Sequence, residues 1–209
     1  MTMRERIASG KLFTDNCEGL KEDRIRCKKA IIRFNSTSPD DTEIRKNALN
    51  ELLGKETNAY VEPPFYCCYG RNISIGEGSY LNFNCNFVDD DKITIGKNVL
   101  FGPMVTIATV GHPINQDKRE YMYTDPVTIE DNCWIGANVT ICPGVHIGKN
   151  SVIGAGSVVV NSIPSNSVAV GNPCKVIRTI NKHDQIYYYK DRLFDEEDLK
   201  EEYKLRNTL

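Results

Sequence analysis

Residues 129–163 read IEDNCWIGANVTICPGVHIGKNSVIGAGSVVVNSI, and this stretch decides the fold. An aliphatic residue returns at every sixth position, namely Ile129, Ile135, Ile141, Ile147, Ile153 and Val159. Three positions after each of the first five comes an Asn or a Gly: Asn132, Asn138, Gly144, Asn150 and Gly156. These residues take positive φ most readily, so the pattern predicts a short strand and a tight corner, repeated. Three such units make one triangular turn of a parallel β-solenoid with a continuous aliphatic core.

The same register reaches back toward the N-terminus with two interruptions. Ile75 and Ile95 begin earlier pieces, which are extended in steps of six by Leu81, Phe87, Phe101 and Ile107. Two extra residues fall around Asp89, Asp90 and Asp91, and a longer insertion separates Ile107 from Ile129. We therefore expect an extruded loop over about 108–126, which contains Gly111-His112-Pro113. Insertions into solenoids map to loops on one face, often the binding face. An ordinary β-sandwich would not place Asn or Gly at one phase of a six-residue period.

The chain divides into three parts by pattern. Residues 1–58 are charged, with apolar residues at helical spacing, and predict helices over Met3–Gly10, Leu20–Phe34 and Asp41–Leu53 that cap the first solenoid turn. Residues 59–178 form the solenoid. Residues 179–209 form a C-terminal tail whose acidic end, 195–202, is helical or solvated.

Composition excludes several classes of function. Among 209 residues there are 26 Lys and Arg against 28 Asp and Glu, so the chain lacks the basic surplus of a nucleic-acid binder. No apolar run approaches the roughly 20 residues that span a bilayer. The first residues are charged and lack an apolar signal core, so we expect a cytoplasmic protein without a membrane partner. The eight cysteines contain no C-x-x-C pair, so we expect packed free thiols rather than a zinc knuckle.

Several motifs resemble one family closely. Beside the six-residue ladder stand KLFTDNCEGL (11–20), VEPP (61–64), VDD (88–90), GHP (111–113) and GNPCKVIR (171–178). Together they are similar to the galactoside and maltose O-acetyltransferases, a family of hexapeptide-repeat acyltransferases, over about residues 3–190. The resemblance implies a left-handed β-helix, and the handedness rests on it alone because most β-crossovers are right-handed. It also implies direct acetyl transfer from acetyl-CoA to a sugar hydroxyl, no metal, and a homotrimer with sites between subunits.

This chemistry needs few groups. A sugar hydroxyl is a poor nucleophile at neutral pH, so a base must take its proton, and histidine is suited to that task. The tetrahedral intermediate carries an oxyanion, which needs N–H donors. The resemblance makes His112 the general base, although a loop histidine taken alone would more often be a surface residue. His146 should point outward from the repeat, and His183 lies beyond it in a polar stretch.

The acceptor side is implied residue by residue. Asp15, Asn82 and Asp90 match sugar-holding positions of the family, and Arg24 matches an arginine near the acceptor. Cys68 stands where the family has a serine, and a thiol is the weaker hydrogen-bond partner, so the identity of the acceptor stays open. Without the resemblance, Asp15 would be interpreted as a helix N-cap and Asp90 as a solvated bulge residue.

The coenzyme A side is implied in the same way. Trp134 matches the acetyl end of the site, while Ala137 and Ala155 match positions whose backbone contacts coenzyme A. The Ala137 N–H would also face the oxyanion. Val160 and Asn161 stand where the family has a polar and a basic residue on the coenzyme A side. Lys175 and Arg178 match two basic positions that meet the nucleotide phosphates of coenzyme A, although their spacing alone would favour plain surface charges.

Three other interpretations remain open at this point. The same scaffold could acetylate a non-sugar acceptor such as an antibiotic or an amino sugar, although the 11–20 segment favours sugars. A metal-dependent hydratase on a β-helix would need three zinc-ligand histidines, but the chain has only three in all, and only one or two of them lie on the solenoid. A solenoid that serves only as an assembly scaffold would not need His112.

The loop after His112 is about two residues shorter than in the family and carries an unexpected Tyr121-Met122-Tyr123.

Overall fold

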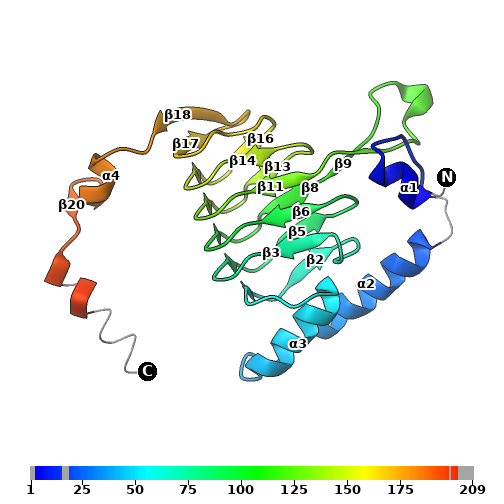
Figure 1. Cartoon of the computed structure of the whole chain (residues 1–209), viewed down its shortest axis with the longest axis horizontal. Coiled ribbons are helices and arrows are strands. Elements are labelled where there is room, and N and C mark those ends of the chain that lie inside the picture. The colour runs from blue at the N-terminus through cyan, green and yellow to red at the C-terminus, as the bar shows by residue number, and fades with distance from the viewer. Residues whose placement is uncertain (1–2, 16–18, 198, 202–209) are drawn as a thin grey trace. The chain divides into compact units, whose positions relative to one another are not determined.

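The computed structural model describes residues 3–15, 19–197 and 199–201. Two compact units divide the chain after Arg178. The first contains the helices and the solenoid, and the second begins at Thr179. The solenoid of the first unit is the parallel β-helix that the repeat predicts, and Figure 1 shows its coils stacked one on another.

Three parallel sheets form the walls of the solenoid. The first stacks β1 (Tyr60–Val61), β4 (Tyr80–Leu81), β7 (Leu100–Phe101), β12 (Trp134–Ile135), β15 (Val152–Ile153), β17 (Ser167–Val170) and β18 (Lys175–Thr179). The second stacks β3 (Ile73–Ile75), β6 (Ile93–Ile95), β11 (Val127–Ile129) and β14 (His146–Ile147). The third stacks β2 (Phe65–Cys67), β5 (Cys85–Val88), β8 (Thr106–Ala108), β13 (Thr140–Ile141) and β16 (Val158–Val159). The chain visits the sheets in the repeating order first, third, second.

The ladder residues fill the interior. Ile75, Ile95, Ile129 and Ile147 are buried and stand in register on adjacent strands of the second sheet. In the first coils of the core, the rings of Phe65 and Phe87 meet edge to face with centroids 5.1 Å apart. Every aliphatic residue that the six-residue spacing assigns to the core of 129–163 is buried: Ile129, Ile135, Ile141, Ile147, Ile153 and Val159.

The corners confirm the role of the Asn and Gly positions. All five predicted corner residues of the 129–163 repeat have positive φ, from 56° at Asn138 to 76° at Gly144. Side chains along one corner also bond to each other: Asn132 Nδ2 donates to Asn150 Oδ1 at 3.2 Å, and Asn150 Nδ2 donates to Asn166 Oδ1 at 2.8 Å. Asparagine therefore supplies both the left-handed backbone and a vertical ladder of hydrogen bonds.

Helices α2 (Leu20–Asn35) and α3 (Thr42–Leu53) close the first coil, as expected. Their buried faces join the solenoid core through Cys27, Phe34, Leu49, Leu52 and Leu53. The Asn35 amide donates to the Phe65 carbonyl at 3.1 Å and accepts from the Phe65 N–H at 2.9 Å. This pair satisfies backbone groups at the open edge of the third sheet, where a free strand would invite aggregation.

Helix α1 (Met3–Ala8) does not share that role. Among the described residues of the core, none comes from α1. The helix is shorter than the predicted Met3–Gly10 because the chain turns at Gly10, where φ is 66°. Arg4 instead pairs with Asp23 in the first turn of α2, so α1 lies against the start of α2 rather than under the first coil.

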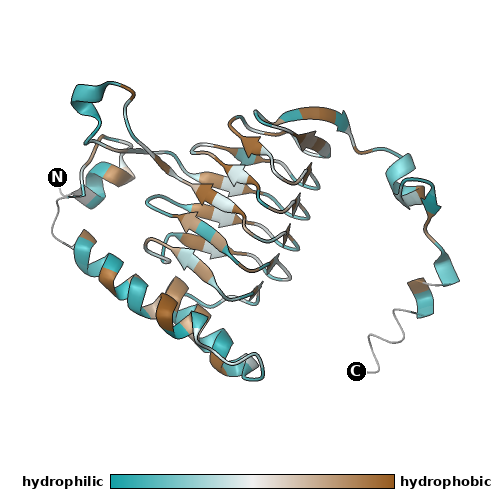
Figure 2. Ribbon diagram, turned by 180° about the vertical axis from the view of Figure 1, so that it is seen from behind, coloured by the Kyte–Doolittle hydropathy of each residue, from teal (hydrophilic) through white to brown (hydrophobic). Residues whose placement is uncertain are grey.

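The insertion is a long loop fixed to the N-terminal segment. It leaves β8 as β9 (Val110–Gly111), forms the short 3-10 helix η1 (Gln116–Lys118), and returns as β10 (Tyr123–Thr124), which pairs antiparallel with β9. The backbones of Phe13 and Met122 exchange hydrogen bonds of 3.0 and 2.8 Å, and both side chains are buried. In Figure 2 most of the projecting loop is coloured hydrophilic.

The cysteines are unpaired in the part of the chain that the structure describes. Seven described cysteines are free thiols, of which Cys27, Cys85, Cys133 and Cys174 are buried, as the packing interpretation requires; Cys17 lies outside the described residues. The C-terminal unit contains α4 (His183–Ile186) and a hairpin of β19 (Tyr187–Tyr189) with β20 (Arg192–Leu193). The described residues of the predicted 195–202 acidic segment are exposed, and residues 198 and 202 fall outside the description.

Candidate active site at two edges of the solenoid

Arg24 joins Asp15, which precedes α2, to the first coils of the solenoid. Its guanidinium donates to the Asp15 carboxylate at 2.5 Å and to the Tyr69 hydroxyl at 3.2 Å. Asp15 precedes α2, but the N-cap of that helix is Gly19, so Asp15 is not the capping residue. About half of the Asp15 side chain is exposed, against a quarter of Arg24. The pair therefore presents a carboxylate to solvent while its cation stays anchored.

Asp90 faces this pair from the bulge after β5. Burial raises the pKa of Asp90 to about 6, and Asp15 adds to the rise, while Arg24 and His112 oppose it. Four predicted site residues, Asp15, Arg24, Asp90 and His112, therefore lie within electrostatic reach of one another, and we call them the acceptor cluster after their predicted role. A carboxylate with a raised pKa near a cation and a histidine is typical of binding and catalytic sites.

Cys68 follows β2 on the same side. Burial, with the Asp90 and Asp89 carboxylates, raises the pKa of the Cys68 thiol to about 12. The side chain is half-buried and remains a neutral thiol at physiological pH. It therefore offers only a weak hydrogen bond to a ligand in this cluster.

His112 is exposed at the base of the loop and held by main-chain groups. Its Nδ1 lies 2.8 Å from the Arg119 carbonyl oxygen and 3.1 Å from that of Tyr121. Carbonyl oxygens only accept hydrogen bonds, so Nδ1 carries the proton and Nε2 keeps its lone pair. The ring is therefore held in the tautomer that a general base requires, with Nε2 as the basic atom.

A second group lies at another edge of the solenoid, where strands of the first sheet end. Asn82 follows β4, and its N–H donates to the Phe101 carbonyl at 3.3 Å. Ala137 and Ala155 lie two residues after Ile135 and Ile153 on the stacked strands β12 and β15. A methyl group added at Gly136 would lie 2.5 Å from the Ala155 N, so the coils approach closely here. Trp134, whose side chain is 55% exposed, stands on the outer face of the same sheet.

The Ala137 amide is available to a ligand. Its carbonyl accepts the Gly156 N–H at 2.8 Å, whereas within the described chain its own N–H has no acceptor. Its side chain is half-buried and adds only one methyl group. An N–H that the solenoid holds in a fixed place, without an acceptor in the described chain, suits the binding of an oxyanion.

The remaining coenzyme-side positions are spread more widely. Val160 and Asn161 follow β16 and are exposed at the end of the third sheet. Lys175 and Arg178 are exposed in β18 and stand three positions apart, so their side chains leave opposite faces of that strand.

Two groups that are not among the predicted site residues adjoin the acceptor cluster. Tyr69 is buried and accepts Arg24 through its hydroxyl, and Asp89 is fully buried beneath it. Burial raises the pKa of Tyr69 to about 12, as does the nearby Asp90. The register break at 89–91 pointed to this region, but no spacing showed which of the three aspartates turns inward.

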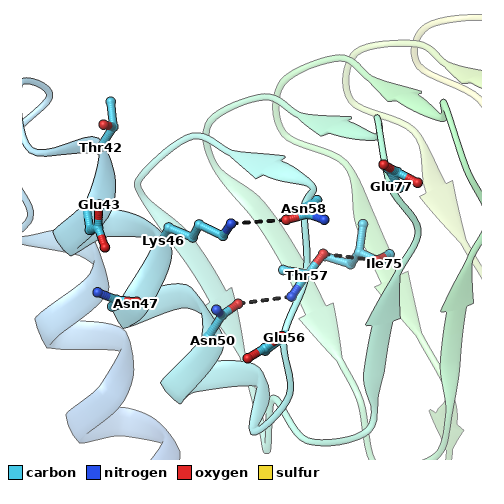
Figure 3. Close-up of a pocket in the computed structure, with 10 residues that line it drawn as sticks. All are labelled: Thr42, Glu43, Lys46, Asn47, Asn50, Glu56, Thr57, Asn58, Ile75 and Glu77. Atoms are coloured by element: carbon cyan, nitrogen blue, oxygen red, sulfur yellow. Dashed lines mark hydrogen bonds between the residues drawn. The ribbon is translucent and has the colours of Figure 1, made fainter.

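A large surface hollow lies elsewhere. About 610 Å³ in volume, it lies between α3 and the first coil and is lined by Thr42, Glu43, Lys46, Asn47, Asn50, Glu56, Thr57, Asn58, Ile75 and Glu77. Figure 3 shows that its central polar groups bond to each other: Lys46 donates to Asn58, and the Thr57 N–H to Asn50. It contains none of the predicted site residues. A cavity of about 410 Å³ adjoins the acceptor cluster instead, with Tyr69, Asp90 and Arg26 among its walls.

The other two histidines lie apart from the cluster. His146 is exposed, and its Nε2 lies 2.9 Å from Glu130 Oε1, as expected of an outward-facing repeat residue. His183 stacks on Tyr187 in the C-terminal unit.

Within residues 3–15, 19–197 and 199–201, His, Cys, Asp and Glu form no group of three that would hold a metal ion. No helix in that part of the chain is long and apolar enough to cross a membrane.

Comparison with known proteins defines the class and then the family. Residues 126–161 match the hexapeptide repeat of succinyl-transferase, and residues 6–56 match the maltose acetyltransferase hexapeptide capping motif. The fold and the repeat thus define a left-handed β-helix acyltransferase.

Similarity extends over nearly the whole chain. Galactoside O-acetyltransferase of Escherichia coli K12 is 52% identical over 194 residues, which cover 91% of this chain and 96% of that protein. A galactoside acetyltransferase in complex with coenzyme A superposes with a TM-score of 0.88 at 48% identity, covering 94% of this chain and all of the other. A maltose O-acetyltransferase from Clostridium difficile 630 gives 0.84 at 47% identity, with 87% and 98% covered. The chain belongs to the galactoside and maltose O-acetyltransferase family.

Proposed function

We propose that this protein transfers the acetyl group of acetyl-CoA to a hydroxyl of a sugar, with His112 as the general base. The single observation that carries the proposal is the state of His112: two carbonyl oxygens fix the proton on Nδ1 and leave Nε2 free. Asp90 lies within electrostatic reach of His112, and together with Asp15 and Arg24 it offers the donors and acceptors that sugar hydroxyls need. Family membership and the coenzyme A complex of a relative support acetyl-CoA as the donor.

The acetyl group passes directly from coenzyme A to the sugar, without a covalent intermediate on the enzyme. His112 Nε2 takes the hydroxyl proton as the sugar oxygen attacks the thioester carbonyl carbon. The resulting oxyanion accepts the Ala137 N–H, and the Arg119 and Tyr121 carbonyls stabilise the imidazolium. Collapse of the intermediate breaks the carbon–sulfur bond, and the imidazolium returns the proton to the departing thiolate. The products are the acetylated sugar and free coenzyme A.

The active site is composite in this proposal. His112, Asp90 and Cys68 lie where the third sheet ends, whereas Ala137 and Asn82 lie where it begins. The four residues of β5 separate these edges by about 13 Å, at roughly 3.3 Å per residue. A second copy of the chain would bring one edge against the other, and cyclic symmetry with three copies would close such a contact.

Mixing two inactive variants tests the composite site. His112→Ala removes the base at one edge, and Ala155→Trp blocks the coenzyme wall at the other. If sites form between copies, co-assembly at equal amounts restores about one quarter of the sites, because a quarter combine an intact edge from each variant. Activity that stays at the level of the single variants would show that each chain holds its own complete site.

A sugar panel tests the reaction itself. Coenzyme A release from acetyl-CoA is followed with galactosides, glucose-type sugars and a buffer blank, and the blank also discounts the protein's eight cysteines. We expect sugar-dependent release and an acetylated product by mass spectrometry. Release with an amino sugar or antibiotic alone would replace the sugar acceptor with a non-sugar one. Absence of both release and acetyl-CoA binding would refute the transferase.

A further inference from the structure

Asp89 is a buried carboxylate that the proposed reaction does not use. It lies in the bulge after β5, between Val88 and Asp90, and none of its surface is exposed. Its neighbours in the bulge are anchored independently: the Asn72 amide donates to the Asp89 carbonyl at 2.6 Å, and the Asp91 N–H donates to Thr109 Oγ1 at 2.9 Å. The backbone of the bulge is therefore held without the Asp89 side chain.

The side chain instead holds the segment that follows β2. One oxygen, Oδ1, accepts the N–H of Cys68 at 2.8 Å and the N–H of Tyr69 at 2.9 Å. The other oxygen, Oδ2, is buried and has no partner within the described chain. Burying a half-satisfied carboxylate costs free energy, so this group is a poor device for stability alone.

The segment that Asp89 holds organises the acceptor cluster. Tyr69 accepts Arg24 Nη1 through its hydroxyl at 3.2 Å and Arg26 Nη2 through its carbonyl at 2.7 Å. The next residue, Gly70, has φ of 74°, and a methyl group there would lie 2.3 Å from the Leu52 carbonyl. The segment is thus pressed against α3 on one side and tied to α2 on the other. Its position decides where Cys68 and Arg24 stand.

We propose that Asp89 is a positioning residue for the acceptor: through the Cys68 and Tyr69 amides it sets the places of the Cys68 thiol and the Arg24–Asp15 pair beside Asp90. The inference rests on the proposed function, because it takes this cluster as the acceptor site. Asp89 itself touches neither substrate. Its effect is on the positions of the groups that bind the acceptor, and it leaves the coenzyme edge of the solenoid unaffected.

The test is Asp89→Asn, which keeps the shape and removes the charge. We expect the KM for the acceptor to rise about tenfold or more, as weakening of two buried hydrogen bonds predicts, while the KM for acetyl-CoA stays within about twofold. Asp131→Asn is the matched control, because Asp131 also accepts a backbone N–H, that of Lys97 at 2.7 Å, at a corner away from the cluster. It should change neither KM.

Hydrogen exchange gives a readout that does not depend on turnover. In Asp89→Asn we expect faster exchange of the Cys68 and Tyr69 amides and unchanged exchange in 134–147. Faster exchange with a selective rise in acceptor KM supports the proposal. Unchanged exchange, or equal rises in both KM values, overturns it. If wild type uses only a non-sugar acceptor, the proposed sugar specificity fails, and the same comparison with that acceptor still decides the role of Asp89.

Discussion

Replacing Asp90 should change both the free energy of unfolding and the KM for the acceptor. Burial raises its pKa to about 6 from an ordinary value of 3.8, which corresponds to a cost of up to about 3 kcal/mol when the folded protein holds it ionised. The folded state binds this proton more tightly than the unfolded chain does. The cost is therefore absent below about pH 4, grows through the window between 4 and 6, and is complete above it. Asp90→Asn removes the charge and should stabilise the fold at pH 8.

The assay is urea unfolding followed by circular dichroism at several pH values and one protein concentration. We expect Asp90→Asn to exceed wild type by up to about 3 kcal/mol at pH 8 and to match it near pH 4, while its acceptor KM rises about tenfold through the lost charged hydrogen bond. Asp117→Asn, on the exposed loop, gives the baseline for removing one surface carboxylate. A variant less stable than wild type at pH 8, or a gain of equal size at pH 4, would refute the reasoning.

Three further predictions concern the ladder, the corners and Cys68. Ile135→Ala removes a fully buried side chain and should cost about 3 kcal/mol in urea unfolding; a cost below about 1 kcal/mol would contradict the continuous core. Asn132→Ala should be about 1 kcal/mol less stable than Asn132→Gly, because φ is 60° there and alanine is strained in that region; equal melting would exclude backbone strain. Cys68→Ser should lower the acceptor KM about fivefold by restoring a stronger hydrogen-bond partner, and an unchanged KM would remove Cys68 from the acceptor site.

The solenoid was predictable because its six-residue repeat places an aliphatic residue in the core and an Asn or Gly at the corner of each unit. Each coil needs an aliphatic residue inside and a residue with positive φ at the corner, so the sequence alone predicts the burial of Ile135 and the left-handed backbone of Asn138. Helices α2 and α3 followed from their apolar faces to within one residue at each end. The position of α1 was not predictable, because a helix of only six residues, three of them charged, is too short to show an apolar face that would indicate its packing partner.

The acceptor cluster was predictable only in part. Motifs pointed to Asp15, Arg24 and Asp90, and the structure brings them together. Tyr69 belongs to no motif, and the VDD motif (88–90) contains Asp89 without showing that its side chain is buried, because both roles come from burial and from backbone donors on another coil. The tautomer of His112 depends on carbonyl groups seven and nine residues away in a folded loop, and local sequence does not encode that contact. A single chain also holds apart the two edges that the proposed composite site would combine.

The most direct test of the account is the turnover number of wild type, His112→Ala and His146→Ala with the best sugar of the panel, at saturating acetyl-CoA. His146 is exposed and paired with Glu130, so its variant controls for loss of an imidazole from the surface. We predict a fall of about 10²–10⁴-fold for His112→Ala alone, the range expected for loss of a general base, with acetyl-CoA binding retained. Turnover in His112→Ala within a few-fold of wild type would contradict His112 as the base.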